Sequence, residues 1–185
     1  MSRAAAAFAC VVMSTCWGCS PPAARTTFLR SVDLVDMTDS MAESFAGDPV
    51  ISARTRASGR WVISIDQVAN GTYQVMPAHE KWLYTTRMRA LIAESDFAAR
   101  RNIVWVIPPE GWPAAPHELR PEDRDPRLAP THLLSGEFQV LTNTSAAGRS
   151  DMYVCAFQLT EIANGRLVWE DIWEVKYAAR GLTWD

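Results

Sequence analysis

Three predicted β-strands between residues 131 and 177 constrain the fold of this chain more than any other feature. The first covers residues 131–141 and is expected to turn at residues 142–144. The second covers residues 151–162 and the third residues 167–177. Turn-forming residues separate strand-forming runs of this kind, so consecutive strands are expected to pair as hairpins.

Apolar residues alternate along the second and third strands with a period of two, which places them on one face of a sheet. The residues expected to face inward are Tyr153, Cys155, Phe157, Leu159, Leu167, Trp169, Trp173, Val175 and Tyr177. Between these strands, Asn164-Gly165 is the strongest hairpin signal, because both residues tolerate the positive φ that a type I′ turn needs. The sequence therefore predicts an antiparallel meander with one buried face.

A helix is predicted over residues 31–45, because apolar residues recur there at helical spacing. Its apolar face carries Leu34, Met37, Met41 and Phe45. Ser31 is expected to cap the helix, and Gly47 to end it in the left-handed conformation. The acidic residues Asp33, Asp36 and Glu43 are expected on the solvent side, which is favoured strongly over a metal cluster.

A strand–helix–strand unit is predicted in the middle of the chain. A strand over residues 60–68 ends at Asn70-Gly71-Thr72, a helix over residues 78–97 follows, and residues 103–107 form a short, uniformly apolar strand that is expected to be buried. The predicted fold is a small two- or three-layer α/β (α+β) domain, with a mixed β-sheet and a C-terminal antiparallel meander packed by helices.

The first 18 residues have the layout of a secretory signal peptide, with a basic residue before a short apolar run. Gly18-Cys19 then resembles the bacterial lipobox, in which a small residue precedes the cysteine that becomes acylated. Cys16 is the alternative lipidation site, and simple cleavage to a soluble periplasmic protein is the competing hypothesis. Residues 19–30 are expected to form a short linker and residues 31–185 one domain.

Residues 108–130 interrupt that domain with a proline-rich, highly charged loop. A connection of this length is usually either functional or disordered. A merely mobile insertion is favoured over a partner-contacting loop, and both readings stay open.

The residues that common enzyme chemistry needs are missing. No Gly-x-Gly pair is present, so no dinucleotide or phosphate loop is expected, and no cofactor or small-molecule substrate is evident. His79-Glu80 begins like a zinc motif but lacks the second histidine. A Cys155–His132 dyad is conceivable, yet Cys155 alternates with aromatic residues and is expected to be a buried structural thiol. We therefore predict that the chain is not an enzyme and binds no metal.

Two further classes of partner are disfavoured. The net charge of −3 and the scattered arginines argue against nucleic acid. Four tryptophans could stack on sugars, but they occupy inward positions and are expected in the core; these are Trp61, Trp105, Trp169 and Trp173.

The order of motifs along residues 31–177 resembles the penicillin-binding protein activators of the LpoB type, whose domain is akin to the N-terminal domain of TolB. The matching motifs are the lipobox, the segment from Ser31 to Met41, Val68-Ala-Asn-Gly-Thr72, Tyr84-x-x-Arg87, His132-Leu-Leu-Ser-Gly-Glu137, Tyr153-x-Cys-x-Phe-x-Leu159 and Asn164-Gly-Arg-Leu-Val-Trp169. Their spacing, rather than any one motif, carries the resemblance.

The resemblance implies a non-enzymatic lipoprotein of the outer membrane, facing the periplasm. Its implied partner is a class A penicillin-binding protein, whose peptidoglycan synthesis it would stimulate. The alternative is a periplasmic binding module for an envelope transport or secretion assembly. No motif of the resemblance assigns contact residues in this chain.

Overall fold

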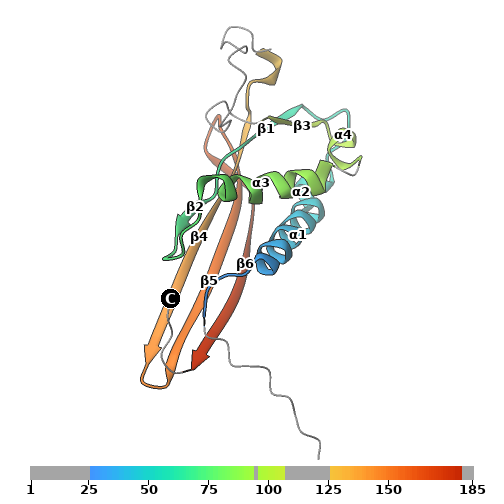
Figure 1. Cartoon of the computed structure of the whole chain (residues 1–185). Coiled ribbons are helices and arrows are strands. Elements are labelled where there is room, and N and C mark those ends of the chain that lie inside the picture. Colours follow the sequence, from blue (N-terminus) through green and yellow to red (C-terminus); the bar gives the residue numbers. More distant parts are fainter. Residues whose placement is uncertain (1–25, 94–95, 107–125, 181–185) are drawn as a thin grey trace, which may run out of the picture.

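A computed structural model describes residues 26–93, 96–106 and 126–180, and shows helices packed on a mixed β-sheet (Figure 1). This confirms the predicted α/β class. The predicted signal peptide, Cys16, Cys19 and most of the proline-rich loop lie outside the described residues. Among the described residues, no helix is long and apolar enough to cross a membrane.

The elements follow one another in the order printed on Figure 1. The helices are α1 (Ser31–Gly47), α2 (Pro49–Ser52), α3 (Ala78–Ala93) and α4 (Phe97–Arg100), with a 3-10 turn at Pro126–Leu128. The strands are β1 (Trp61–Ile65), β2 (Ala69–Gly71), β3 (Ile103–Val106), β4 (His132–Ser145), β5 (Gly148–Glu161) and β6 (Arg166–Arg180).

The sheet has the strand order β3-β1-β4-β5-β6, with the short β2 paired to β4 beside β1. β1 pairs in parallel with β3 and with the start of β4, whereas β4, β5 and β6 are antiparallel. Helix α3 connects the parallel strands β1 and β3, as the predicted strand–helix–strand unit requires. β3 lies at the edge of the sheet, however, and only Ile103 in it is fully buried, so the prediction of a buried strand is wrong.

The C-terminal meander is confirmed, but both of its turns differ from the prediction. The β4 ladder continues through residues 142–144, and the chain turns at residues 146–147 instead. Thr142 faces inward there and donates to Asp151, which extends the pairing beyond the apolar part of the strand. Between β5 and β6, residues 162–165 form a four-residue loop. Only Gly165 has a positive φ, of 71°, so the turn is not type I′.

The inward alternation of β5 and β6 is confirmed except at Leu167. The ladder has a bulge at this point: Leu159 pairs with Trp169, but Thr160 pairs with Leu167. The extra residue reverses the face on which Leu167 lies, because a bulge shifts the alternation by one position. Leu167 is therefore 47% exposed, while Trp169 is buried.

The core lies between the helices and the inner face of the meander. Helix α1 contributes Met37, Met41 and Phe45 from the predicted apolar stripe, and α3 contributes Tyr84, Met88 and Ile92. Phe45 contacts Trp105 on β3 and Trp169 on β6, with ring centroids 5.9 and 5.3 Å apart. β3 and β6 are opposite edges of the sheet, so the sheet curls around this end of α1.

Three helix boundaries differ from their predictions. Arg30, not Ser31, is the N-cap, because Asp33 reaches back to the Arg30 backbone N–H. Gly47 stays in the helix, because Asp48 caps a new helix, α2, directly after it. The helix expected over residues 78–97 is described as two, α3 and α4, which are separated by residues outside the described set.

The packing of this core can be tested by a substitution at Gly136 on β4. A Cβ there would lie 3.0 Å from the Phe157 ring and 3.3 Å from Val68, whose side chains are themselves buried. Gly136→Ala should therefore lower the free energy of unfolding by about 1–3 kcal/mol, because a full core cannot absorb an added methyl group. Gly47→Ala is the control: its Cβ meets nothing within 4 Å. It should be neutral or stabilise the helix by up to about 1 kcal/mol. Urea unfolding measures both, and an equal effect of the two changes would contradict the packing described here.

Candidate functional site

The residues considered for catalysis lie apart from one another. Cys155 is fully buried and pairs across the sheet with Phe138 and Trp173. His132 stands six residues before Phe138 on β4, roughly 20 Å along an extended strand. Burial raises the pKa of the Cys155 thiol far above its usual range, which disfavours the reactive thiolate. The structure does not bring the conceivable dyad together.

The other histidines and the acidic helix also fail to converge. The His132 ring lies 4.3 Å from the Trp61 ring, its Nδ1 is 2.8 Å from Thr131 Oγ1, and burial lowers its pKa. His79 is exposed at the start of α3, and His117 lies outside the described residues. Within the part of the chain that the structure describes, no three His, Cys, Asp or Glu side chains form a group that could hold a metal ion.

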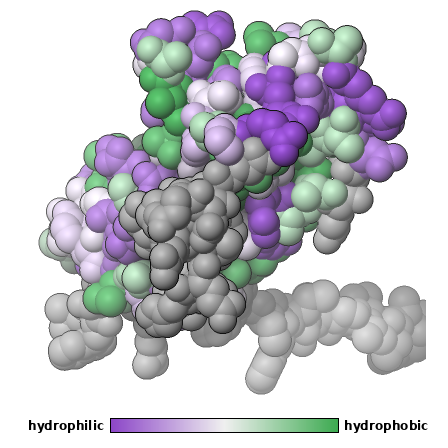
Figure 2. Space-filling model, turned by 90° about the horizontal axis from the view of Figure 1, so that it is seen from above, coloured by the Kyte–Doolittle hydropathy of each residue, from purple (hydrophilic) through white to green (hydrophobic). Residues whose placement is uncertain are grey.

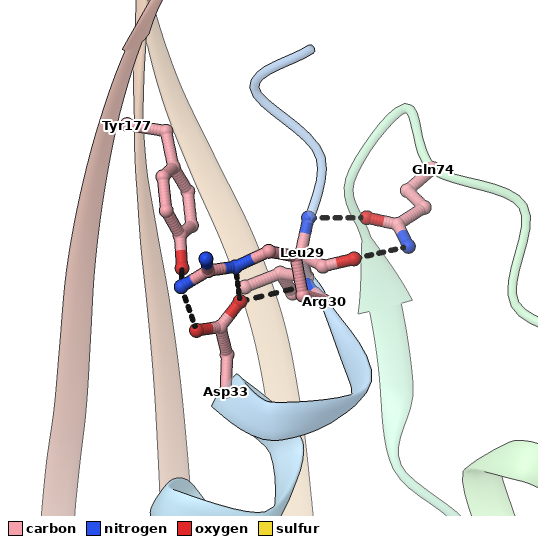
Figure 3. A network of polar contacts seen from close by, with 5 residues as sticks. All are labelled: Leu29, Arg30, Asp33, Gln74 and Tyr177. Atoms are coloured by element: carbon pink, nitrogen blue, oxygen red, sulfur yellow. Dashed lines mark hydrogen bonds and ion pairs between the residues drawn. The ribbon is translucent and has the colours of Figure 1, made fainter. Parts of the chain in front are cut away.

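Asp33 does not face solvent as predicted but is buried against Arg30 and Tyr177. The Arg30 backbone N–H donates to Asp33 Oδ2 at 2.7 Å, and its Nη2 donates to Oδ1 at 3.1 Å and to the Tyr177 hydroxyl at 2.9 Å (Figure 3). Burial alone would raise the pKa of Asp33, but hydrogen bonds from Arg30 and Tyr177 hold it below its ordinary value. Asp36 and Glu43 are exposed, as expected.

Residues 26–30 form a strap that crosses the meander before α1 begins. Leu29 and the Gln74 side chain exchange two hydrogen bonds, of 3.0 and 3.3 Å (Figure 3). Next to them, Thr27 Oγ1 donates to Asp151 Oδ2 at 2.5 Å. The strap thus joins the segment before α1 both to the loop after β2 and to β5.

Asp151 is the centre of the polar group beneath the strap. It is fully buried and also accepts from Thr142 Oγ1 at 2.6 Å and Arg149 Nε at 3.1 Å. Burial would raise its pKa, but these hydrogen bonds and the Arg149 charge hold the pKa below its ordinary value. The sequence contains the signal for this site: Asp151 lies two residues before Tyr153, in the inward phase of the strand, where a carboxylate needs partners.

The opposite face of the meander carries apolar side chains among charged ones. Aligned across the strands, its three central rows are Glu137-Ala156-Ile172, Gln139-Val154-Glu174 and Leu141-Met152-Lys176. Leu141 and Ile172 remain 62% and 51% exposed. Helices α1 and α3 pack on the inner face, so no described helix covers this one. We call these nine residues the outer face of the meander.

Comparison with known proteins gives fold-level likenesses only. No family model matches the chain, and no curated protein matches it significantly. The LpoB C-terminal domain from Salmonella enterica aligns over 77% of this chain and 94% of its own, with 15% identity and a TM-score of 0.38. The LpoB C-terminal domain from Escherichia coli aligns over 72% and 96%, with 15% identity and a TM-score of 0.34.

A second kind of bacterial lipoprotein gives a similar result. Lipoprotein GNA1162 from Neisseria meningitidis aligns over 63% of this chain and 82% of its own, with 14% identity and a TM-score of 0.38. Structures similar to this chain thus include LpoB C-terminal domains and another lipoprotein, all at low identity. Likenesses this weak decide neither its activity nor its partner.

The charge on Asp151 can be tested directly. Asp151→Asn keeps the size of the side chain but removes the charge that faces Arg149, so the free energy of unfolding at pH 7 should fall by about 1–3 kcal/mol. The folded-state pKa is depressed, so this contribution is present above about pH 4 and is lost as the pH falls through the folded pKa. Urea unfolding at pH 7 and pH 3 should therefore show a weaker pH dependence in the variant.

Asp36→Asn is the matched control, because Asp36 is exposed on α1. It should leave the free energy of unfolding at pH 7 unchanged. If both variants lost the same stability, the loss would reflect net charge and not the buried group around Asp151.

Proposed function

We propose that this chain is a non-enzymatic, lipid-anchored envelope protein whose domain binds a class A penicillin-binding protein and promotes its peptidoglycan synthesis. The signal-peptide layout with Cys19, or alternatively Cys16, supports the anchor. The order of motifs from Ser31 to Trp169 supports the partner. Two or more acyl chains would hold the domain stably at a membrane. Ser20 follows Cys19 in place of the Asp that commonly retains lipoproteins in the inner membrane, which favours the outer membrane with the domain facing the periplasm.

The observation that carries a binding role is the outer face of the meander. Exposed Leu141 on β4 and exposed Ile172 on β6 lie on the two strands that flank β5, and the ladder holds these strands rigid. Glu137, Glu174 and Lys176 lie on the same face. Apolar side chains within a polar surround are the usual composition of a protein–protein contact. A rigid sheet also loses little conformational freedom on binding, which favours affinity.

Binding and stimulation can be measured with the purified full chain in detergent. It should retain the class A penicillin-binding proteins of the same cell in a pull-down, and it should raise the rate of glycan polymerisation. Leu141→Glu and Ile172→Glu should each weaken retention about tenfold or more, because a charge would then be buried at the contact.

The control is Val32→Glu, at a residue of α1 that is about as exposed as Ile172. It should leave retention and polymerisation unchanged. If the chain retains these proteins and none of the three variants changes retention, the contact does not lie on the outer face of the meander. If the unchanged protein shows no retention and no stimulation, the proposed function is refuted.

The short tether favours a second candidate function. With Cys19 lipidated and the strap beginning at Thr26, six residues separate the two, and six residues span at most about 20 Å even when fully extended. A partner embedded in the same membrane is easier to reach over this distance than one in the opposite membrane. The second candidate is therefore a binding module for an envelope transport or secretion assembly, which crosslinking in cells would reveal by recovering only such components.

Palmitate labelling tests the anchor on which both candidates depend. Cells expressing the full chain should incorporate radiolabelled palmitate into it, and Cys19→Ala should abolish the label. Cys16→Ala is the paired variant and should leave the label in place. The reverse pattern would move the site to Cys16, and unlabelled protein in every case would refute lipidation.

A further inference from the structure

Four arginines that are far apart in the sequence meet at one hollow of the surface. Arg54, Thr55, Arg56, Arg100 and Arg101 line an open hollow of about 640 Å³ between the residues after α2 and the end of α4. In the view from above, strongly hydrophilic surface gathers on the side of the molecule where α4 lies (Figure 2). The expectation that the arginines are scattered is therefore wrong for these four, because the fold joins two segments that are about 45 residues apart.

Two of the four guanidinium groups are held in place by aromatic rings. The Arg54 guanidinium lies 3.7 Å from the centre of the Trp61 ring, and the Arg101 guanidinium lies 3.8 Å from that of Phe97. Arg54 Nη2 also donates to the Gly59 carbonyl oxygen. Stacking of this kind fixes the plane of the guanidinium, so little conformational freedom remains to be lost when an anion binds.

No carboxylate among the described residues compensates the positive charge of this hollow. Across residues 26–93, 96–106 and 126–180, no ion pair involves Arg54, Arg56, Arg100 or Arg101, whereas Arg30, Arg87, Arg149 and Arg166 each pair with a carboxylate. The Nε atoms of Arg54 and Arg101 are buried and have no hydrogen-bond partner. Burial lowers the pKa of Arg54, and no neighbouring acid offsets this shift.

We propose that this hollow binds a phosphate-bearing anion with two or more negative charges, such as a diphosphate group. Guanidinium forks match the oxygen atoms of phosphate in bidentate geometry. Four positive charges around one hollow favour a group that carries several negative charges over a single carboxylate. The exposed Arg56 and Arg100 can reach outward to the ligand, while the stacked Arg54 and Arg101 form the base of the hollow.

Such a group could be soluble or could belong to the head of an anionic lipid, and two arms of one experiment separate these sources. The full chain in detergent is titrated calorimetrically with inorganic pyrophosphate. The full chain is also floated with phosphatidylcholine vesicles that either contain or lack phosphatidylglycerol. We expect saturable binding in at least one arm that weakens as the salt concentration rises.

The test variant is Arg56→Gln/Arg100→Gln, which alters two exposed side chains and leaves the stacked pair intact. It should weaken pyrophosphate binding, or flotation with the anionic vesicles, about tenfold or more. Arg166→Gln/Lys81→Gln is the matched control, because it removes the same charge from β6 and α3 at positions that do not line the hollow. The control should stay within about twofold of the unchanged protein.

Each outcome bears on the proposal. Variant-sensitive binding in the calorimetric arm identifies a soluble phosphate ligand, and variant-sensitive flotation identifies a lipid head group. If the test and control variants lose the same amount of binding, the binding depends only on net charge, and the proposal is overturned. Absence of binding in both arms would overturn it as well. Neither result depends on the penicillin-binding protein, so failure here is distinct from failure of the proposed function.

Discussion

The arrangement of this domain depends on the aromatic contacts of Phe45. Its ring touches Trp105 and Trp169, which belong to the two edge strands of the sheet, and it lies 6.4 Å from the ring of Phe97 on α4. Aromatic pairs at such distances contribute energy beyond the burial of their area. One residue of α1 therefore holds together elements from both edges of the sheet, and the curl of the sheet around α1 follows from these contacts. The placement of α4, and with it of the arginine-lined hollow, rests on the same cluster.

Much of the fold could be predicted because the periodic signals in this chain are strong. The inward series from Tyr153 to Leu159 and the helical stripe from Met37 to Phe45 both lie where periodicity predicts. The predictions fail where contacts and register between strands, and not periodicity alone, decide the outcome. Residues 142–144 resemble a turn, but the buried Asp151 keeps Thr142 in the ladder. Leu167 follows the apolar phase of its strand, but a bulge places it on the other face.

The candidate sites were harder to predict than the fold, because their residues come from distant segments. Asp33 has the spacing of a solvent-facing helix residue, yet Tyr177, which is 144 positions later, takes part in its burial. The four arginines of the hollow form no pattern in the sequence, since their proximity depends on how α2 and α4 pack. The outer face of the meander is different: once the strands are paired, alternation alone identifies its members. Of the surfaces proposed to bind a partner or ligand, it is the one whose residues can be identified from the sequence.

The strap over the meander determines where mechanical load enters the domain. Any tension that arrives along the chain from before Thr26 acts first on the bond between Thr27 and Asp151, and then on the paired hydrogen bonds between Leu29 and Gln74. These contacts, together with the Arg30–Asp33 pair, lie between the chain that precedes Thr26 and the first turn of α1. A pull on the segment before Thr26 is thus borne by β5 and the loop after β2. The apolar contacts of α1 with the core remain unloaded until the strap has detached.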